Sequence, residues 1–165
     1  MSETDISPVL THLDSEGRVQ MVDVGHKVAT ERTAVAEGEV HLSAHAWTLL
    51  SAQANAKGEV LNTARIAGIL AAKRCAELIP LCHTLPLSFV GVDFTADESR
   101  HVLTIRSTCH TRHQTGVEME AMTACTVAAL TVYDMCKAAD KGIMLGQIRL
   151  ISKSGGKSGD WHRNH

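Results

Sequence analysis

Apolar and polar residues alternate in some segments of the chain and follow a helical spacing in others. Alternation with a period of two, typical of half-buried β-strands, runs through residues 33–42, 87–95, 101–109 and 144–152. Helical spacing of apolar residues runs through residues 44–56, 60–78 and 117–139. Ser43 precedes the first of these helices as a suitable N-cap, and Pro80 follows the second as a helix stop.

The order of these elements predicts the fold class. Residues 96–100 form a polar turn, so the two strands around it are expected to form a hairpin. If the two early helices are merged, the order becomes β-α-β-β-α-β, the ferredoxin-like arrangement of an α+β domain. We therefore expect an antiparallel sheet with helices packed on one face. The other face would need a cover, and burial in an oligomer is one way to provide it.

The chain has the length of a single domain, at 165 residues. Residues 1–20 are polar and are expected to be a mobile arm, and residues 21–152 are expected to form the domain. Residues 153–165 are rich in Gly, Ser and Lys and predict a loop and tail. Aromatic residues make up only 3% of the chain, so the core must be built from aliphatic side chains and Met.

Composition and charge argue against several classes of protein. The formal net charge of −2 gives no support for nucleic-acid binding through overall charge. No apolar run is long enough to span a bilayer, and the N-terminus lacks the pattern of a signal peptide, so we expect a cytoplasmic protein. The cysteines are odd in number and show no C-x-x-C spacing, which predicts buried, reduced thiols at Cys75, Cys82, Cys109, Cys125 and Cys136.

Ionisable residues stand at both ends of the apolar helix expected over residues 117–139. Glu118 and Glu120 lie at its beginning, and Asp134 and Lys137 lie near its end. Residues three apart share a helix face, so Asp134 and Lys137 can form an acid–ammonium pair. Unpaired buried charge is costly, so these groups are expected to be paired or used in chemistry, with a solvated surface as the alternative.

Basic residues and a histidine form further candidate sites. Lys57 stands at a Gly-containing helix entrance, where the helix dipole disfavours a cation, so a ligand anion is a suitable partner and a surface lysine is the alternative. His83 follows a helix stop and is either a structural residue or a ligand or proton-transfer group. The segment KSGGKSGD lacks the spacing of a P-loop, but its glycines allow backbone N–H groups to curl around an anion; a solvated tail is the alternative.

Several segments together resemble one family: MVDV, KGEVLNTARIAGILAAKR, LIPLCH, TGVEMEAM, AALTVYDMCKA and KSGGKSGD. Residues 10–160 resemble the molybdenum cofactor biosynthesis protein C family, the cyclic pyranopterin monophosphate synthases. The resemblance implies a lyase that converts 3′,8-cyclo-7,8-dihydro-GTP to cyclic pyranopterin monophosphate with release of pyrophosphate, and without a metal or organic cofactor. It also implies a ferredoxin-like fold and a homohexamer, a trimer of dimers, with active sites at the subunit interfaces.

The resemblance implies roles for particular residues. Asp134 matches the catalytic acid/base of the family, and Lys137 lies beside it. Substrate contacts are implied for Lys57, Arg65, Lys73, Leu81, Cys82, His83, Glu118, Met119, Glu120, Lys153 and Lys157. Asp23 and Arg32 lie in matching segments without a defined role, and the tail after residue 152 is expected to contribute to the active site. One departure is His113-Gln114, where many relatives carry a basic residue, which would alter anion affinity locally.

The implied substrate matches the chemistry of these residues. A triphosphate needs several cations, so we expect Lys57, Arg65, Lys153 and Lys157 to gather around it from distant segments. Each step of the reaction moves protons, so a paired acid and base is required. We expect Lys137 to be partly desolvated and Asp134 to be kept ionised by its charge, so that the pair exchanges protons with the substrate.

Two other classes of function stay open at this point. A nucleotide- or RNA-binding module without catalysis would use aromatic residues exposed on the sheet. Phe89 and Phe94 fall on opposite faces of their strand by parity, which weakens that hypothesis. A metal-sensing oligomer would use the histidines, but Cys109, His110 and His113 lack an evident fourth ligand.

Overall fold

The computed structural model of the chain describes residues 11–51 and 60–164. Its elements, in chain order, are β1 (Thr30–His41), α1 (Ala44–Ser51), α2 (Val60–Lys73), α3 (Cys75–Leu78), β2 (Leu87–Asp97), β3 (Val102–His113), α4 (Glu118–Cys136), β4 (Met144–Ser154) and β5 (Trp161–His162). In the described part of the chain, none of the helices combines the length and the apolar character needed to cross a membrane.

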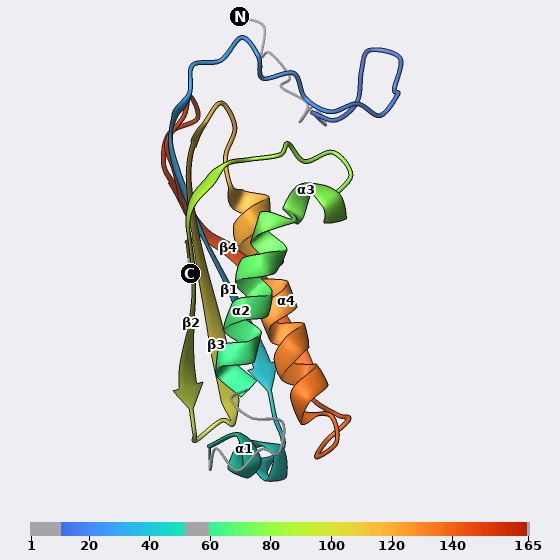
Figure 1. Cartoon of the computed structure of the whole chain (residues 1–165), viewed down its shortest axis with the longest axis vertical. Helices are drawn as coiled ribbons and strands as arrows, with labels where there is room; N and C mark the ends of the chain where they lie inside the picture. The colour runs from blue at the N-terminus through green and yellow to red at the C-terminus, as the bar shows by residue number, and fades with distance from the viewer. Residues whose placement is uncertain (1–10, 52–59, 165) are drawn as a thin grey trace, which may run out of the picture.

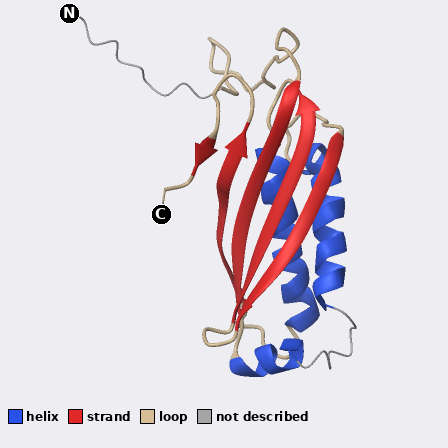
Figure 2. Ribbon diagram, turned by 90° about the vertical axis from the view of Figure 1, so that its left-hand side faces the viewer, coloured by secondary structure: helices blue, strands red, loops and turns tan. Residues whose placement is uncertain are grey.

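The strands form one antiparallel sheet in the order β2-β3-β1-β4-β5. Helices α2 and α4 lie side by side against one face of this sheet (Figure 1). Turning the molecule by 90° shows the sheet with both long helices behind it (Figure 2). The α+β, ferredoxin-like fold predicted from the sequence is therefore confirmed, with β5 as an added edge strand.

The core lies between the sheet and the helices, and small residues make it thin. Along β1 the alternating residues Ala34, Ala36 and Val40 are fully buried beneath the helices. Helix α4 faces them with alanines, which bring its backbone close to the sheet. The hydroxyl of Ser107 on β3 donates a 2.6 Å hydrogen bond to the backbone oxygen of Ala121 on α4. A core of alanine and β-branched side chains therefore replaces the aromatic residues that the composition lacks.

Several boundaries differ from those predicted. Helix α2 ends at Lys73 instead of continuing to residue 78, because Arg74 forms a turn before the short helix α3. Strand β3 continues to His113, since the polar residues after Cys109 are still paired with β1. The first helix is described only to Ser51, so its predicted end at residue 56 lies outside the described residues.

The tail is more ordered than a solvated loop. Strand β4 runs on to Ser154, and Trp161 and His162 then pair with it as β5, which no periodicity in so short a segment could indicate. At the other end, residues 11–20 include a turn closed by pairing of Leu13 with Val19. The predicted domain boundaries at residues 20 and 152 stay predictions.

The two phenylalanines lie on opposite faces of β2, as their parity predicts. Phe94 faces the helices, where the guanidinium carbon of Arg65 lies 5.3 Å from its ring centroid. Phe89 is half exposed on the other face, beside His110 at 5.0 Å between ring centroids.

Gly68 allows the close approach of α2 and α4 and gives a test of this packing. A Cβ atom at this position would lie 2.8 Å from the backbone oxygen of Ala124. Gly68→Ala should therefore destabilise the fold by about 1–3 kcal/mol, although alanine favours helices. Chemical denaturation measures this, with Gly146→Ala as the control, because the added Cβ there would meet its nearest atom at 3.8 Å. Equal stability of the two variants would contradict the packing described.

Candidate functional site

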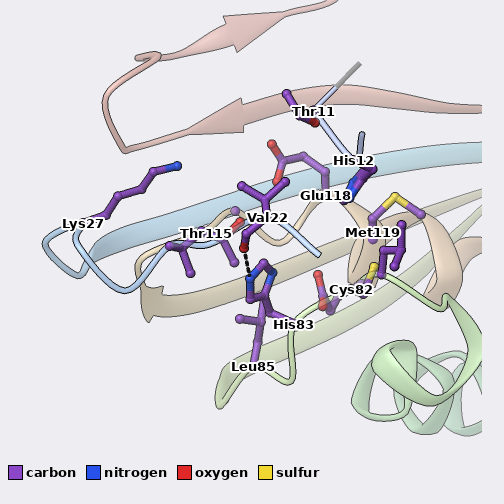
Figure 3. A pocket seen from close by; sticks show the side chains of 14 residues that line it. Thr11, His12, Val22, Lys27, Cys82, His83, Leu85, Thr115, Glu118 and Met119 are labelled. Atoms are coloured by element: carbon purple, nitrogen blue, oxygen red, sulfur yellow. Dashed lines mark hydrogen bonds between the residues drawn. The ribbon is translucent and has the colours of Figure 1, made fainter. Parts of the chain in front are cut away.

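A cavity of about 340 Å³ opens at the start of α4. Its walls come from the segment before β1, the segment after α3, and the first turn of α4 (Figure 3). The predicted site residues Leu81, Cys82, His83, Glu118, Met119 and Glu120 all line it, together with Thr11, His12, Val22, Val24, Lys27, Leu85, Thr115 and Gly116. The LIPLCH and TGVEMEAM segments, distant in sequence, thus meet in one place.

The two glutamates of the first helical turn have different environments. Glu118 is partly exposed and forms an ion pair with Lys153, with 3.1 Å between Oε1 and Nζ. Glu120 is only 4% exposed. Burial raises the pKa of the Glu120 carboxyl above its ordinary value, and the negative charge of Glu118 adds to this rise. One carboxyl group is therefore paired with a cation, and its neighbour is buried in surroundings that raise its pKa.

His83 is fixed by a hydrogen bond to the segment before β1. Its Nε2 lies 2.8 Å from the backbone oxygen of Val22 (Figure 3). Since a carbonyl oxygen only accepts, Nε2 carries a proton, and Nδ1 is the ring atom left to accept a hydrogen bond in the neutral form. This contact orients the imidazole at the cavity wall.

A second cavity of about 520 Å³ adjoins the first and has a cationic lining. Lys153 and Lys157, both predicted as phosphate ligands, contribute to it, and so do Lys27 and Arg32. Thr115, Gly116, Glu118 and Lys27 line both cavities. The arrangement suits a ligand with a polar ring at one end and several negative charges at the other.

Arg32 organises the glycine-containing loop of the tail. Its guanidinium donates hydrogen bonds to the backbone oxygens of His113, Gln114 and Gly155, at 3.2 to 3.3 Å. Gly155 and Gly156 have φ angles of +88° and +81°, and a Cβ on Gly156 would collide with the Arg32 side chain. The loop therefore wraps around Arg32 and carries Lys153 and Lys157 on either side.

Sequence reasoning missed Lys27 as a site residue and left the role of Arg32 open. Lys27 follows the MVDV segment by only three positions, which is the one signal that could have indicated it. The role of Arg32 depends on carbonyl groups far away in the sequence, and no local pattern indicates those.

Asp134 and Lys137 form the predicted pair, with 2.5 Å between Oδ1 and Nζ, but at the other end of α4. The pair is sixteen residues along the helix from Glu118, which corresponds to about 24 Å at the helical rise. The expected partial desolvation of Lys137 is not seen within one chain, where its side chain is 50% exposed. The hydrogen bond and the charge of Asp134 raise the pKa of Lys137 and keep it protonated.

Two further basic candidates, Arg65 and Lys73, do not join the cationic cavity. Arg65 donates to the backbone oxygen of Val92 at 2.9 Å and to Asn62 at 2.6 Å, so its guanidinium has structural partners within the chain. Lys73 is exposed at the last residue of α2. Lys57 lies outside the described residues. Of the four cations that we expected around the triphosphate, Lys153 and Lys157 are the two that line this cavity in the described part of the chain.

Comparison with known proteins decides the family. The MoaC family matches over residues 21–156. The chain is 64% identical to a protein of Bordetella pertussis, over 96% of this chain and 98% of that protein. It is 62% identical to a Bordetella avium protein (98% and 99% covered) and 56% identical to one from Chloroflexus aurantiacus (93% and 94% covered). All three are named cyclic pyranopterin monophosphate synthase.

The chain belongs to the MoaC family. The resemblance inferred from its motifs is therefore confirmed, and so is the expectation that the chain is an enzyme of this family. His113 and Gln114 bind Arg32 through backbone oxygens, which any residue at these positions would supply, so this contact does not depend on the departure in side chains. Among the described residues, no three His, Cys, Asp or Glu side chains are grouped so as to hold a metal ion.

Replacing Glu120 tests its buried environment. Because its folded-state pKa is raised, its stabilising contribution is full in acid and is lost as the pH rises through that pKa. Glu120→Gln keeps the shape and cannot ionise, so its melting temperature should exceed that of the unaltered protein by a few degrees at mildly alkaline pH. The difference should shrink as the pH falls toward 4.5, the ordinary pKa of glutamate.

The exposed Glu77 provides the matched control. Glu77→Gln should show no such pH-dependent difference in thermal unfolding. If Glu120→Gln and the unaltered protein differ by the same amount at every pH, the buried carboxyl is not the cause.

Proposed function

We propose that this chain is a cyclic pyranopterin monophosphate synthase that converts 3′,8-cyclo-7,8-dihydro-GTP to cyclic pyranopterin monophosphate and pyrophosphate. The names of its MoaC relatives support the activity. The observation that carries the proposal is the pair of joined cavities, one with carboxylates and His83 and one with lysines. This polarity suits a nucleotide-derived ring joined to a triphosphate.

The two cavities divide the substrate between them. Lys153, Lys157 and Lys27 supply positive charge for the phosphates, and Arg32 holds their loop in place. In the other cavity, Glu118, Glu120 and His83 present hydrogen-bonding groups to the ring and its amide edge, beside the apolar surfaces of Leu81 and Met119. Cys82 lines the same wall.

The acid–ammonium pair must come from a second copy of the chain. Asp134 and Lys137 lie about 24 Å along α4 from Glu118 in their own chain, too far to act on a substrate held there. If two copies pair with their α4 helices antiparallel about a two-fold axis, the end of one helix meets the start of the other. Such pairing would bury Ile66, Leu70 and Leu130, which are 59%, 49% and 54% exposed on α2 and α4.

In that arrangement the pair performs proton transfer. Lys137, held protonated by Asp134, donates a proton to the substrate, and the Asp134 carboxylate accepts one. A ring is opened and rebuilt, and a ribose hydroxyl then attacks the α-phosphorus. The new P–O bond closes the cyclic phosphate, the bond to the β-phosphate oxygen breaks, and pyrophosphate leaves. Lysines of the cationic cavity stabilise the charge that develops on the phosphates. The hexameric assembly and a cytoplasmic location are part of this proposal.

Substitution of the pair tests the assignment. Lys137→Ala and Asp134→Asn should each lower product formation by about 10²-fold or more, because each removes a proton-transfer group. Product and pyrophosphate are measured together from the cyclised nucleotide. Lys141→Ala, at an exposed lysine four residues beyond Lys137, is the control and should keep full turnover. Unchanged turnover in Lys137→Ala, with the oligomer mass preserved, would rule out this role.

A further inference from the structure

The ion pair between Glu118 and Lys153 lies where the two cavities adjoin. Glu118 lines both cavities, and Lys153 lines the cationic one. The Oε1 of Glu118 lies 3.1 Å from the Nζ of Lys153. In Figure 3 the Glu118 carboxyl points toward the ribbon of the tail. An acidic side chain at the first cavity therefore binds a lysine of the second, where the phosphates are expected.

Gly116 leaves the space that this conformation of Glu118 needs. A Cβ atom at Gly116 would collide with Oε2 of Glu118 and would lie 2.9 Å from its Oε1. The carboxyl thus folds back over the backbone of the residue two positions before it. A side chain at position 116 would have to displace this carboxyl, which is the free end of a flexible side chain.

The place that the carboxylate occupies also suits a phosphoryl group. A lysine ammonium donates charge-assisted hydrogen bonds to carboxylates and phosphates alike. Lys27, Arg32 and Lys157 line the same cavity, so its lining keeps an excess of positive charge even with Glu118 present. Lys153 also donates to the hydroxyl of Ser158 in the tail loop, at 3.4 Å. A phosphate chain that enters this cavity therefore meets one lysine that a carboxylate already holds.

We propose that Glu118 is a specificity-determining residue, whose carboxylate holds the place of a phosphoryl group on Lys153 until a ligand with both a ring and a phosphate chain binds. Pyrophosphate alone must displace this carboxylate and offers it no new partner, so its binding is weakened. The ring of the full substrate can donate hydrogen bonds from its amide edge to the released carboxylate in the adjoining cavity. After turnover the carboxylate pairs with Lys153 again and helps pyrophosphate to leave. The inference deepens the proposed function and rests on it for the identity of the substrate.

Pyrophosphate binding to the full-length protein, measured by isothermal titration calorimetry, tests this inference. Glu118→Gln keeps the size of the side chain and removes its charge. The dissociation constant of pyrophosphate should therefore fall about fivefold at low salt, as expected for the loss of one partly exposed ion pair. The gain should shrink at high salt, which screens the pair.

Glu31→Gln is the matched control for the loss of a negative charge near the cavity. Glu31 precedes Arg32 in the sequence, but its exposed carboxyl lies near Arg112, at 4.0 Å, instead of near a lysine of the cavity. This variant should bind pyrophosphate as the unaltered protein does. Unchanged affinity in Glu118→Gln, an equal gain in Glu31→Gln, or no binding of pyrophosphate by any of these proteins would overturn the inference.

Gly116→Ala separates the position of the carboxyl from its charge. The added methyl group moves the carboxyl away from Lys153, so Glu118→Gln should improve pyrophosphate affinity less in a Gly116→Ala background than in the unaltered protein. Any steric effect of the methyl group on the ligand is common to both proteins of that background and cancels. Equal gains in the two backgrounds would contradict a carboxylate held over Gly116.

Turnover gives a second readout, which a merely structural ion pair would not move. In Glu118→Gln, inhibition by pyrophosphate should strengthen by the same factor as its binding. The KM for the cyclised nucleotide should not fall with it, because the ring loses its carboxylate partner. Parallel falls of both constants would overturn the role in specificity. Absence of product in the unaltered protein would instead refute the proposed function, and the calorimetric titration would still decide the role of Glu118.

Discussion

The length of helix α4 fixes the distance between the ionisable groups at its two ends. A hydrogen-bonded helix of nineteen residues cannot bend its two ends together, and its alanine-lined face is held against the sheet. Glu118 at its start is therefore kept about 24 Å from Asp134 near its end. Because the two cavities lie at the start of α4, the acid–ammonium pair lies away from them within one chain. In our proposal the two groups are half-sites, which a second copy of the chain brings together.

At the start of α4, two glutamates close in sequence have different surroundings. Glu118 and Glu120 are two positions apart, yet Glu118 forms an ion pair with Lys153 and Glu120 is buried. This difference places a carboxyl group paired with a lysine beside a carboxyl group whose pKa is raised by burial. Arg32 acts indirectly. Its guanidinium donates hydrogen bonds to backbone oxygens and so fixes the loop that carries the lysines.

Much of the fold could be predicted because its signals are local. Strict alternation in β1 and helical spacing in α4 locate those elements, and their order gives the ferredoxin-like topology. The end of α2 and the strand β5 were missed, since they depend on a turn at Arg74 and on pairing with β4. In the site, motifs identified six of the residues that line the first cavity. They could not indicate that Lys137 is half exposed or that Arg65 binds the backbone oxygen of Val92, because these facts depend on tertiary contacts.

Complementation between two variants, each of which should be inactive alone in our proposal, tests the divided site most directly. Lys137→Ala removes a group from the end of α4, and Glu120→Gln removes one from its start. If each site takes these groups from different chains, co-expression of the two variants yields hybrid pairs in which one site carries both defects and the other carries none. The account predicts recovery of about a quarter of the activity of the unaltered protein, as random pairing requires. Co-expressed variants that form mixed oligomers and stay as inactive as each variant alone would contradict it.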